Sequence, residues 1–503
     1  MTPPPPSTSP GAEPRQAAAD LLAGLVPGAP TPTLPTPWGD ESAAVAAVLG
    51  WVTRRVARTS DPKATARSES ELQAATGRTV TAAGIGAERA LRLFDEVLVP
   101  ATRAQDDAMM LAYVPSAPTG AAVAFELATS AANIFAGLWE SGAGAIHAEN
   151  QVIAWLVELL GWPVTAGGCF VAGGTVGNLS ALVTARHTAQ SGGSLSGAMF
   201  RPAPAQADPV RWVVACTAEA HSSIRSAARV MGVDVLEVPE DDDGRLCASA
   251  LTRALHSEED AGRRVFAVVA SAGTTNEGVV DDLAGVARVC ARYGVWLHVD
   301  GAYGGAALAA PSARQLFAGI ERADSFIVDP HKWLFAPYDS CALVYRRPAL
   351  ARATHTQRAV YLDEVDHTDW NPADLAIHLT RRPRGLPMWF SLATHGTDRY
   401  RAAVERSLAT ARDVAEAIRR RPFLRLVREP VLSVVLFERV GWSDADYRRW
   451  SRAHALAGTM LCVPTRWRGR SVLRLVFVNP ATDPAAVVRV LDTLQGGDVP
   501  TSQ

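Results

Sequence analysis

Short apolar runs alternate with segments of helical length between residues 119 and 387. Five such runs of four or five residues recur, at 212–216, 265–269, 295–299, 325–328 and 341–345. They are rich in β-branched and aromatic residues and nearly all apolar, which is typical of strands buried on both faces of a mostly parallel sheet. The pattern therefore predicts an α/β domain in which helices flank the sheet.

Helical periodicity recurs outside and between these runs, at 41–58, 82–99, 121–139, 148–161 and 177–189. After residue 387 a long helix rich in arginine and alanine is predicted at 397–421. Two strand-like stretches follow, at 432–439 and 471–478, and a last helical stretch comes after them. This succession is typical of a smaller α+β domain.

Four regions follow from these patterns. Residues 1–40 are rich in proline, serine, threonine and glycine, so they cannot bury enough apolar area to offset the entropy of ordering, and we expect a disordered tail. Residues 41–118 are expected to form a helical segment, residues 119–387 a large domain, and residues 388–503 the small α+β domain.

Composition excludes several classes of protein. With 48% hydrophobic and 20% charged residues, the 503-residue chain has the composition of a globular protein, not of a disordered, collagen-like or coiled-coil one. A net charge of -2 argues against electrostatic binding of nucleic acid. No apolar run is long enough to span a bilayer, and no basic stretch followed by an apolar core indicates a secretory signal.

The six cysteines are scattered and include no Cys-x-x-Cys pair, so no zinc or other metal site is predicted. Most of them lie in apolar segments, where a reduced thiol behaves as a small hydrophobic group. We therefore expect a cytoplasmic protein with reduced thiols.

Ligands of open α/β sheets bind where strands end and helices begin, so polar residues at the predicted strand ends are the first candidates. The Gly-rich stretch 168–178, with Gly173, Gly174 and Thr175, leads into a helix whose free N–H groups favour an anion. It lacks the lysine of a P-loop and the dinucleotide spacing, so taken alone a plain turn explains it somewhat better. His221 follows the first apolar run, and a lone histidine there is more often structural than functional.

Asp300 directly follows the run 295–299, where a carboxylate is costly unless it is paired. A helix cap or a salt bridge would explain it. So would a carboxylate that is held in a low dielectric to keep a partner cationic. The small residues after it, Gly301-Ala302 and Gly304-Gly305, leave room for a flat group.

Lys332 lies in the exit turn of the run 325–328, between histidine and tryptophan. Only Lys63 and Lys332 are lysines, since every other basic residue among the 49 is arginine. Lys63 lies in a polar segment and is expected to be solvated. In the apolar setting of Lys332, burial would lower the pKa of the amine and make it nucleophilic.

Together these four features are what pyridoxal 5'-phosphate requires. An anion cradle holds the phosphate, a nucleophilic lysine forms the Schiff base, and a buried aspartate keeps the pyridine nitrogen protonated so that the ring acts as an electron sink. Each feature is modest alone, but the ordered set of four is specific. Pyridoxal phosphate is therefore the predicted cofactor.

The same residues resemble those of the group II pyridoxal-phosphate-dependent amino acid decarboxylases of fold type I, the family of aromatic-amino-acid, glutamate and diaminobutyrate decarboxylases. The most specific motif is Asp329-Pro330-His331-Lys332-Trp333, and His298-Val299-Asp300-Gly301-Ala302-Tyr303-Gly304-Gly305 is nearly as specific. The likeness extends from about Ala112 to the last helix. It implies a homodimer with the active site at the interface, in which residues 41–118 form a dimerisation segment.

The resemblance also implies roles for the matching residues. Lys332 would form the Schiff base, Asp300 would pair with the pyridine nitrogen, and His221 would stack on one face of the ring. The other cofactor contacts would be Gly173, Gly174, Thr175, Thr274, Ala302 and His331.

Two further predictions concern the reaction and the substrate. The stretch around Tyr361 looks like the family's mobile loop, whose tyrosine returns a proton to the substrate Cα, although Tyr361 could also be one surface tyrosine among eight. Tyr113 and Ser116 are the predicted substrate contacts. Val114 and Gly137 stand where aromatic-specific members tend to carry bulky aromatics, so aromatic, branched aliphatic, diaminobutyrate-like and acidic L-amino acids all stay open.

Decarboxylation of an L-amino acid to its amine and CO2 is the predicted reaction. An aldehyde synthase or an aminotransferase would use the same cofactor. Arg474 is a formal candidate for an aminotransferase's carboxylate-binding arginine, although its strand setting favours a structural ion pair. The alternative from another class is a silent scaffold that binds the cofactor, and the presence of Lys332, Asp300, His221 and Tyr361 argues against it.

Overall fold

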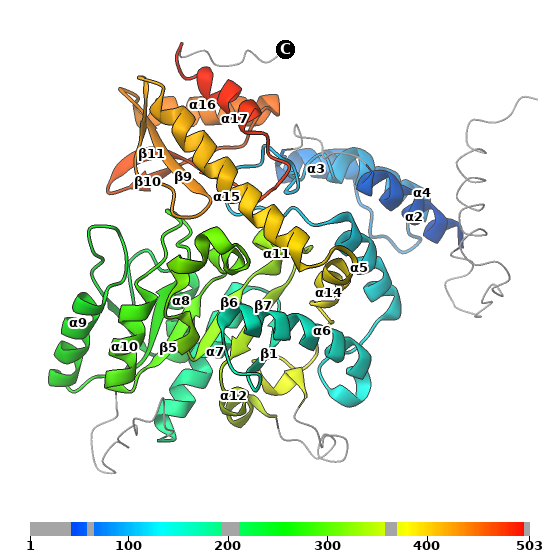
Figure 1. Ribbon diagram of the computed structural model, residues 1–503. Helices are drawn as coiled ribbons and strands as arrows, with labels where there is room; N and C mark the ends of the chain where they lie inside the picture. Colours follow the sequence, from blue (N-terminus) through cyan, green and yellow to red (C-terminus); the bar gives the residue numbers. More distant parts are fainter. Residues whose placement is uncertain (1–41, 58–64, 193–210, 358–369, 497–503) are drawn as a thin grey trace, which may run out of the picture. The chain divides into compact units, whose positions relative to one another are not determined.

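The computed structural model describes residues 42–57, 65–192, 211–357 and 370–496. These fall into two compact units, one reaching Asp107 and including Ala455–Thr459, the other containing Ala108–His454 and the residues from Met460 onward (Figure 1). Within the described ranges, no helix combines the length and the apolar character needed to cross a membrane. The predicted tail at 1–40 lies outside the described residues.

The first unit is helical, with α2 (Ser42–Val56), α3 (Glu69–Thr76), α4 (Ala87–Leu93) and the π-helical turn η1 (Phe94–Leu98). Trp51 packs edge-on against Phe94 with ring centroids 5.1 Å apart, and its indole N–H donates to Asp95 at 2.7 Å. The helix predicted at 82–99 begins only at Ala87, because Gly84 and Gly86 adopt positive φ angles just before it.

The second unit contains a seven-stranded sheet of β1 (Gly167–Val171), β2 (Trp212–Cys216), β3 (Asp234–Glu237), β4 (Arg264–Ser271), β5 (Trp296–Asp300), β6 (Ser325–Val328) and β7 (Cys341–Tyr345). The spatial order is β1-β7-β6-β5-β4-β2-β3, and within this sheet only β7 runs antiparallel to its neighbours. All five predicted runs are strands. The apolar pattern does not predict β1, which opens with two glycines, or β3, which exposes two of its four residues.

Alternate residues of a central strand pack into different hydrophobic cores, one on each face of the sheet. This explains why the predicted strand runs are apolar throughout. In β2, Val213 and Ala215 belong to a core on one face of the sheet, whereas Val214 and Cys216 belong to a core on the other. Both faces are therefore closed to water by helices. The α/β fold class with a mostly parallel sheet is confirmed.

The helices that surround this sheet are α5 (Gly120–Ala132), α6 (Trp139–Leu160), α7 (Gly174–Gln190), α8 (Ser222–Met231), α9 (Ala248–Asp260), α10 (Leu283–Tyr293), α11 (Pro330–Trp333), α12 (Pro348–His355) and α14 (Leu386–His395). Two predicted ends are wrong. α5 stops before Asn133, whose left-handed backbone ends it, and α6 begins nine residues before position 148 despite Gly142 and Gly144 in its first turns.

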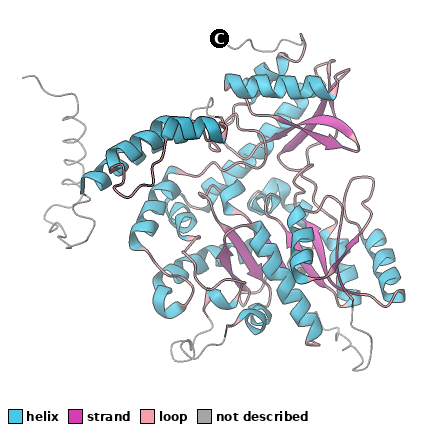
Figure 2. Cartoon of the chain, turned by 180° about the vertical axis from the view of Figure 1, so that it is seen from behind, coloured by secondary structure: helices cyan, strands magenta, loops and turns pink. Residues whose placement is uncertain are grey.

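A separate four-stranded antiparallel sheet follows, with β8 (Leu424–Leu426), β9 (Val434–Arg439), β10 (Val463–Trp467) and β11 (Arg470–Val476) in the order β10-β11-β9-β8. Its helices are α15 (Thr397–Arg419), α16 (Asp444–Ala457) and α17 (Pro484–Asp492). Figure 2 shows the two sheets as separate groups of strands. This is the α+β arrangement that the sequence predicts.

The topology of the large sheet brings several strand exits together. Strands β2, β4, β5 and β6 are parallel, and β1 has the same direction because both β1 and β6 are antiparallel to β7. Their carboxyl ends therefore lie at one edge of the sheet. The Gly-rich stretch, His221, Asp300 and Lys332 all follow these ends, as the sequence predicts.

Candidate active site

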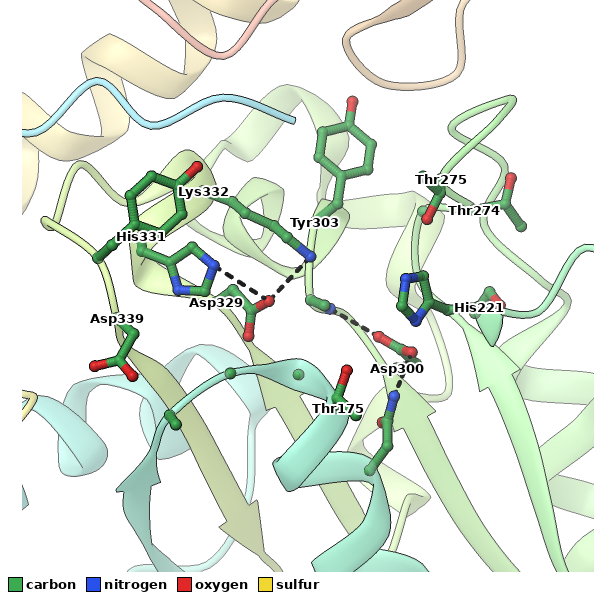
Figure 3. Close-up of a pocket in the computed structure, with 18 residues that line it drawn as sticks. Thr175, His221, Thr274, Thr275, Asp300, Tyr303, Asp329, His331, Lys332 and Asp339 are labelled. Carbon is green, nitrogen blue, oxygen red and sulfur yellow. Dashed lines mark hydrogen bonds and ion pairs between the residues drawn. The ribbon is translucent and has the colours of Figure 1, made fainter. Parts of the chain in front are cut away.

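A cavity of about 300 Å³ lies at this edge (Figure 3). Nine predicted site residues line it: Gly173, Gly174, Thr175, His221, Thr274, Asp300, Ala302, His331 and Lys332. They come from five separate strand exits. Side chains more than 100 residues apart in sequence thus meet around one hollow.

Lys332 lies on α11, a one-turn helix that begins with Pro330 directly after the β6 exit. Its Nζ is 2.9 Å from Asp329 Oδ2. Burial lowers the pKa of Lys332, but the charge and hydrogen bond of Asp329, together with the charge of Asp300, outweigh this and hold the pKa above its ordinary value. The expectation that burial alone lowers this pKa is therefore wrong, and the ammonium must lose a proton before the amine can act as a nucleophile.

His331 lies beside this pair, with Nε2 3.8 Å from Asp329 Oδ2. Its Nδ1–H donates to the carbonyl of Ser340 at 2.6 Å, which leaves Nε2 on the cavity side. The ring packs against Tyr338 with centroids 4.8 Å apart. Burial lowers the pKa of His331, and Asp329 offsets this only in part.

Asp300 is buried, and its two carboxylate oxygens accept from neutral groups. Oδ1 accepts from the Ala302 backbone N–H at 3.0 Å, and Oδ2 accepts from the Asn178 amide at 2.9 Å. In the described parts of the chain, no basic side chain forms an ion pair with Asp300, and it caps no helix. A buried carboxylate with neutral donors only can still accept a cationic partner from the cavity.

The predicted anion site is the start of α7. Gly173 is its N-cap, and no side chain caps the first turn. A β-carbon on Gly173 would meet nothing within 4 Å, whereas one on Gly174 would lie 3.2 Å from Asp329 Oδ2. Because α7 has 17 residues, its first free N–H groups and the adjacent Thr175 form a setting that favours phosphate.

The glycines after Asp300 serve close packing of the backbone, whereas the sequence suggested that they leave room for a flat group. A β-carbon on Gly301 would lie 2.5 Å from the Phe326 ring, and one on Gly304 would lie 2.2 Å from the Ala272 carbonyl oxygen. These glycines allow close packing against neighbouring strands. Ala302, which lines the cavity beside Asp300, is the small residue that leaves space for a ligand.

His221 is the N-cap of α8, and its Nδ1 accepts from the Ser223 backbone N–H at 3.2 Å. Figure 3 shows the ring over the cavity, opposite the Lys332 and Asp329 side. Thr274 closes a tight loop after β4, where its hydroxyl accepts from the Val279 N–H at 3.1 Å. These contacts with backbone N–H groups fix the positions of the His221 and Thr274 side chains.

Sequence reasoning gave no role to nine residues that line the cavity: Ala172, Asn178, Ser271, Gly273, Thr275, Tyr303, Asp329, Tyr338 and Asp339. Asp329 lies three positions before Lys332, and this spacing was the signal that could have indicated an ion pair between them. Tyr303 stacks on Trp333, with ring centroids 5.4 Å apart, and its hydroxyl pairs with Ser433. Asn178 lies in the first turns of a helix 122 positions from Asp300, and the sequence carries no signal of that contact.

The predicted substrate contacts lie elsewhere in this chain. Tyr113 is 61% exposed and Ser116 is buried, with its hydroxyl donating to the Ala336 carbonyl. Neither is among the residues that line the cavity. Tyr361 lies outside the described residues.

Arg474 is buried on β11, and its guanidinium donates to the backbone carbonyls of Tyr113, Thr275 and Asn276. No carboxylate pairs with it in the part of the chain that the structure describes, so the expected ion pair is wrong. Burial lowers the pKa of Arg474 to about 10. The side chain links the small sheet to the loop that carries Thr275, which lines the cavity.

These features match pyridoxal phosphate group by group. The uncapped start of α7 and His331 suit its phosphate, the unpaired carboxylate of Asp300 suits a protonated ring nitrogen, and Lys332 suits its aldehyde. The ring would lie between His221 and Ala302. The residues present therefore fit the cofactor that the sequence predicts.

Comparisons with known proteins agree. The chain matches the pyridoxal-dependent decarboxylase conserved domain over residues 82–440. It is 33% identical over 384 residues to the L-2,4-diaminobutyrate decarboxylase of Rhizobium meliloti (strain 1021), covering 74% of each chain. It is 29% identical over 399 residues to the aromatic-L-amino-acid decarboxylase of Bacillus atrophaeus, covering 77% of this chain and 80% of that one.

Solved structures show the same fold. The Oryza sativa TDC, crystallised with PLP and tryptamine, has a TM-score of 0.80 at 22% identity and covers 98% of this chain and 99% of that one. Mouse CSAD has a TM-score of 0.79 at 25% identity and covers 90% of this chain and 98% of that one. The chain belongs to the pyridoxal-dependent decarboxylase family, and it is a carboxy-lyase that decarboxylates an amino acid with pyridoxal phosphate as its cofactor.

Proposed function

We propose that the chain converts an L-amino acid to the corresponding amine and CO2 in this cavity, and that Lys332, Asp300 and His221 carry the reaction. One observation supports the proposal above the others. A lysine, in a chain with only two, shares a cavity of about 300 Å³ with a buried aspartate that has no cationic partner among the described residues.

Each residue has a task that its surroundings suit. Lys332 would attach the cofactor, and before attachment its ammonium forms an ion pair with Asp329. When bound, the cofactor accepts the electron pair that the departing carboxylate leaves on Cα. Asp300 would keep a proton on the ring nitrogen, and His221 would cover one ring face opposite Ala302. Thr274 would lie at the ring edge. The phosphate would be held by Gly173, Gly174, Thr175 and His331.

Tyr361 is proposed to deliver the proton that replaces CO2 on Cα. The support is its place in a stretch that resembles the family's mobile loop. In Tyr361→Phe, assayed in air-saturated buffer, we expect product to shift from amine toward aldehyde with consumption of dioxygen, because the proposed proton source is removed and dioxygen serves as the oxidant. An unchanged amine yield, measured by mass spectrometry, would clear Tyr361 of this role.

Charge in the cavity wall bears on the substrate side chain. The charged residues that line it are Asp300, Asp329, Asp339 and Lys332, and no arginine lines it in the described ranges. Arg474 is already bound to three backbone carbonyls. We therefore propose that aromatic, aliphatic or diaminobutyrate-like amino acids are better substrates than aspartate or glutamate, which would find no free cation there.

A product screen tests the function and the substrate class together. Purified protein with added pyridoxal phosphate is offered each common L-amino acid and L-2,4-diaminobutyrate, without a keto acid, and products are identified by mass spectrometry. An amine lighter than its parent by one CO2 is the expected result. Aldehyde formed with consumption of dioxygen would indicate an aldehyde synthase, and turnover only with an added keto acid would indicate an aminotransferase.

We further propose that the protein is a homodimer, that its active site lies at the interface, and that residues 41–118 contribute to dimerisation. The support is that α2, α3 and α4 contain no buried residue, while Val45, Val48 and Phe94 are 52%, 44% and 41% exposed. Apolar side chains that gather on an exposed surface mark interaction sites. Light scattering should give twice the chain mass of 53.3 kDa, and Val45→Asp with Val48→Asp should weaken the dimer.

A cytoplasmic location is also proposed. All six cysteines lie within the described residues, and all six are free thiols. Free thiols are typical of proteins in reducing compartments. Activity recovered in the soluble fraction of gently lysed cells would support this proposal, and activity in a secreted or membrane fraction would contradict it.

A further inference from the structure

A chain of buried hydrogen bonds runs beneath the cavity and ends on two of the proposed site residues. Trp296 Nε1 donates to Ser325 Oγ at 2.8 Å, and Ser325 Oγ lies 2.8 Å from His298 Nδ1. His298 Nε2 lies 2.8 Å from Asn178 Oδ1. The Asn178 amide nitrogen then reaches both Asp300 Oδ2 and Ser223 Oγ, each at 2.9 Å.

The direction of the chain follows from its Asp300 end. An ionised carboxylate only accepts hydrogen bonds, so the amide nitrogen of Asn178 must face Asp300. The Asn178 carbonyl oxygen therefore faces His298, and because that oxygen only accepts, His298 Nε2 carries a proton. Burial lowers the pKa of His298 to about 4, so the ring is neutral and its Nδ1 is an acceptor.

The opposite end is consistent with this direction. The indole N–H of Trp296 only donates, so Ser325 Oγ accepts it and has its own hydroxyl proton available for His298 Nδ1. The Trp296 end therefore permits the direction that the Asp300 end requires.

A branch extends the same logic to His221. The second N–H of Asn178 donates to Ser223 Oγ, and that hydroxyl, 2.8 Å from His221 Nδ1, donates to it. His221 Nδ1 also accepts from the Ser223 backbone N–H. Because Nδ1 is the acceptor in both contacts, the N–H of the His221 ring is Nε2–H.

We propose that Asn178 is a positioning residue whose single amide group holds Asp300 as an oriented acceptor and, through Ser223 Oγ, reinforces the Nε2–H tautomer of His221. The inference rests on the proposed roles of Asp300 and His221. Only a carboxamide offers two donors and one acceptor in this planar arrangement. Aspartate, which has the same shape, would present acceptors to Asp300 and Ser223 and would reverse the polarity of both branches.

The sharpest test is therefore Asn178→Asp, which preserves shape and reverses polarity. Carboxylates at positions 178 and 300 would share one proton, which compromises the charge on Asp300. We expect the dissociation constant for pyridoxal phosphate, measured by fluorescence titration, to rise on the order of 10-fold to 100-fold, the effect of losing one hydrogen bond to a charged group. Ser180→Ala, a buried polar residue in the same helix α7, is the matched control and should bind the cofactor as the wild type does.

A second readout needs no cofactor. In ¹⁵N-histidine NMR spectra of the cofactor-free protein, with His221→Gln used for assignment, the His221 Nδ1 signal should be of the unprotonated type in the wild type and in Ser180→Ala. In Asn178→Asp, Ser223 Oγ would donate to the new carboxylate, and His221 Nδ1 would keep only the Ser223 backbone N–H as its donor, so its signal should shift in the direction of a weaker hydrogen bond. A purely structural role for Asn178 would not move this signal.

The swap variant Asn178→Asp with Asp300→Asn covers the case in which the single variant does not fold. It restores a donor and an acceptor between the two positions, so the melting temperature should recover while cofactor affinity stays low and the His221 signal stays shifted. A folded Asn178→Asp or swap variant with a wild-type His221 signal would overturn the inference. Wild-type cofactor affinity in Asp300→Asn would instead overturn the proposed role of Asp300, so the two failures are distinguishable.

Discussion

A buried aspartate lies at each end of the parallel strands, one at the amino edge and one at the carboxyl edge of the seven-stranded sheet. The two carboxylates have opposite surroundings. At the amino end of β6, Asp324 accepts from the Leu297 N–H at 3.0 Å and pairs with Arg346 and Arg347 at 3.5 and 3.4 Å. Burial raises the pKa of Asp324, and these three partners offset part of that rise. The carboxylate at this edge is neutralised by the protein itself.

At the carboxyl end of β5, Asp300 has neutral donors and no ion-pair partner among the described residues. The amine of Lys332 at the same edge pairs with Asp329, not with Asp300. Because an uncompensated buried charge is costly, such an arrangement persists where a ligand supplies the missing partner. The difference between the two edges separates structural charges from those that face the cofactor site.

The largest effect should come from Lys332. Replacing it with alanine removes the amine that attaches the cofactor and takes from Asp329 its ion pair with Lys332, so amine production should fall below detection. Lys63→Ala, the chain's other lysine, is the control and should retain wild-type activity. Full activity in Lys332→Ala, measured by product formation, would refute the proposed mechanism.

A pair of isosteric variants tests the comparison of edges directly. Asp300→Asn should lower kcat/KM on the order of 10²-fold or more, because it removes the charge that supports the ring nitrogen. It should cost little stability, since losing a charge without a cationic partner offsets the lost hydrogen bond. Asp324→Asn should do the reverse, lowering the free energy of unfolding by about 1–3 kcal/mol while kcat per folded molecule is unchanged.

Steady-state kinetics and chemical denaturation of both variants give the required values. Equal losses of activity, or a greater loss of stability in Asp300→Asn, would remove the distinction between the two edges. Arg346→Lys serves as a further control at the amino edge. Its partly exposed ion pair with Asp324 should tolerate the change with little loss of stability.

The sequence carried most of the information about this sheet and its carboxyl edge. Buried parallel strands need apolar residues on both faces, so β2, β6 and β7 have the predicted bounds. Polar residues that interrupt such a pattern are conspicuous, which is why Asp300 and Lys332 could be found. Asn178 and Arg474 could not be assigned in this way, because Asp300 lies 122 positions from Asn178, Tyr113 lies 361 positions from Arg474, and both contacts depend on how helices and the small sheet pack.

Arg474 offers a second contrast, this time between arginines. Arg346 pairs with a carboxylate at the amino edge, whereas Arg474 donates to three carbonyls, one of them on the cavity-lining Thr275. The three donors of lysine lie on one nitrogen, whereas Nε, Nη1 and Nη2 of Arg474 each reach a different carbonyl, so Arg474→Lys should loosen the Thr275 loop. We expect KM for the substrate to rise about 3-fold to 10-fold with kcat nearly unchanged, and a fall in kcat alone would contradict this positioning role.

The smallest effect concerns His298, which lies on β5 between the two edges and is fully buried. Burial lowers its pKa to about 4, whereas the ordinary value is 6.5. Between these values the unfolded chain binds a proton that the folded chain does not, so stability falls as pH drops from 6.5 toward 4 and is unaffected above 6.5.

His378 and His454, whose pKa values burial also lowers to about 4, add to the same acid sensitivity. His298→Gln should therefore reduce the slope of unfolding free energy against pH by about one proton and leave the other two contributions in place. Denaturant titrations of the cofactor-free protein between pH 4 and pH 8 measure this slope, with the exposed His256→Gln as control. An unchanged slope in His298→Gln would contradict the lowered pKa, and a charged His298 ring would donate to Ser325 as well as to Asn178.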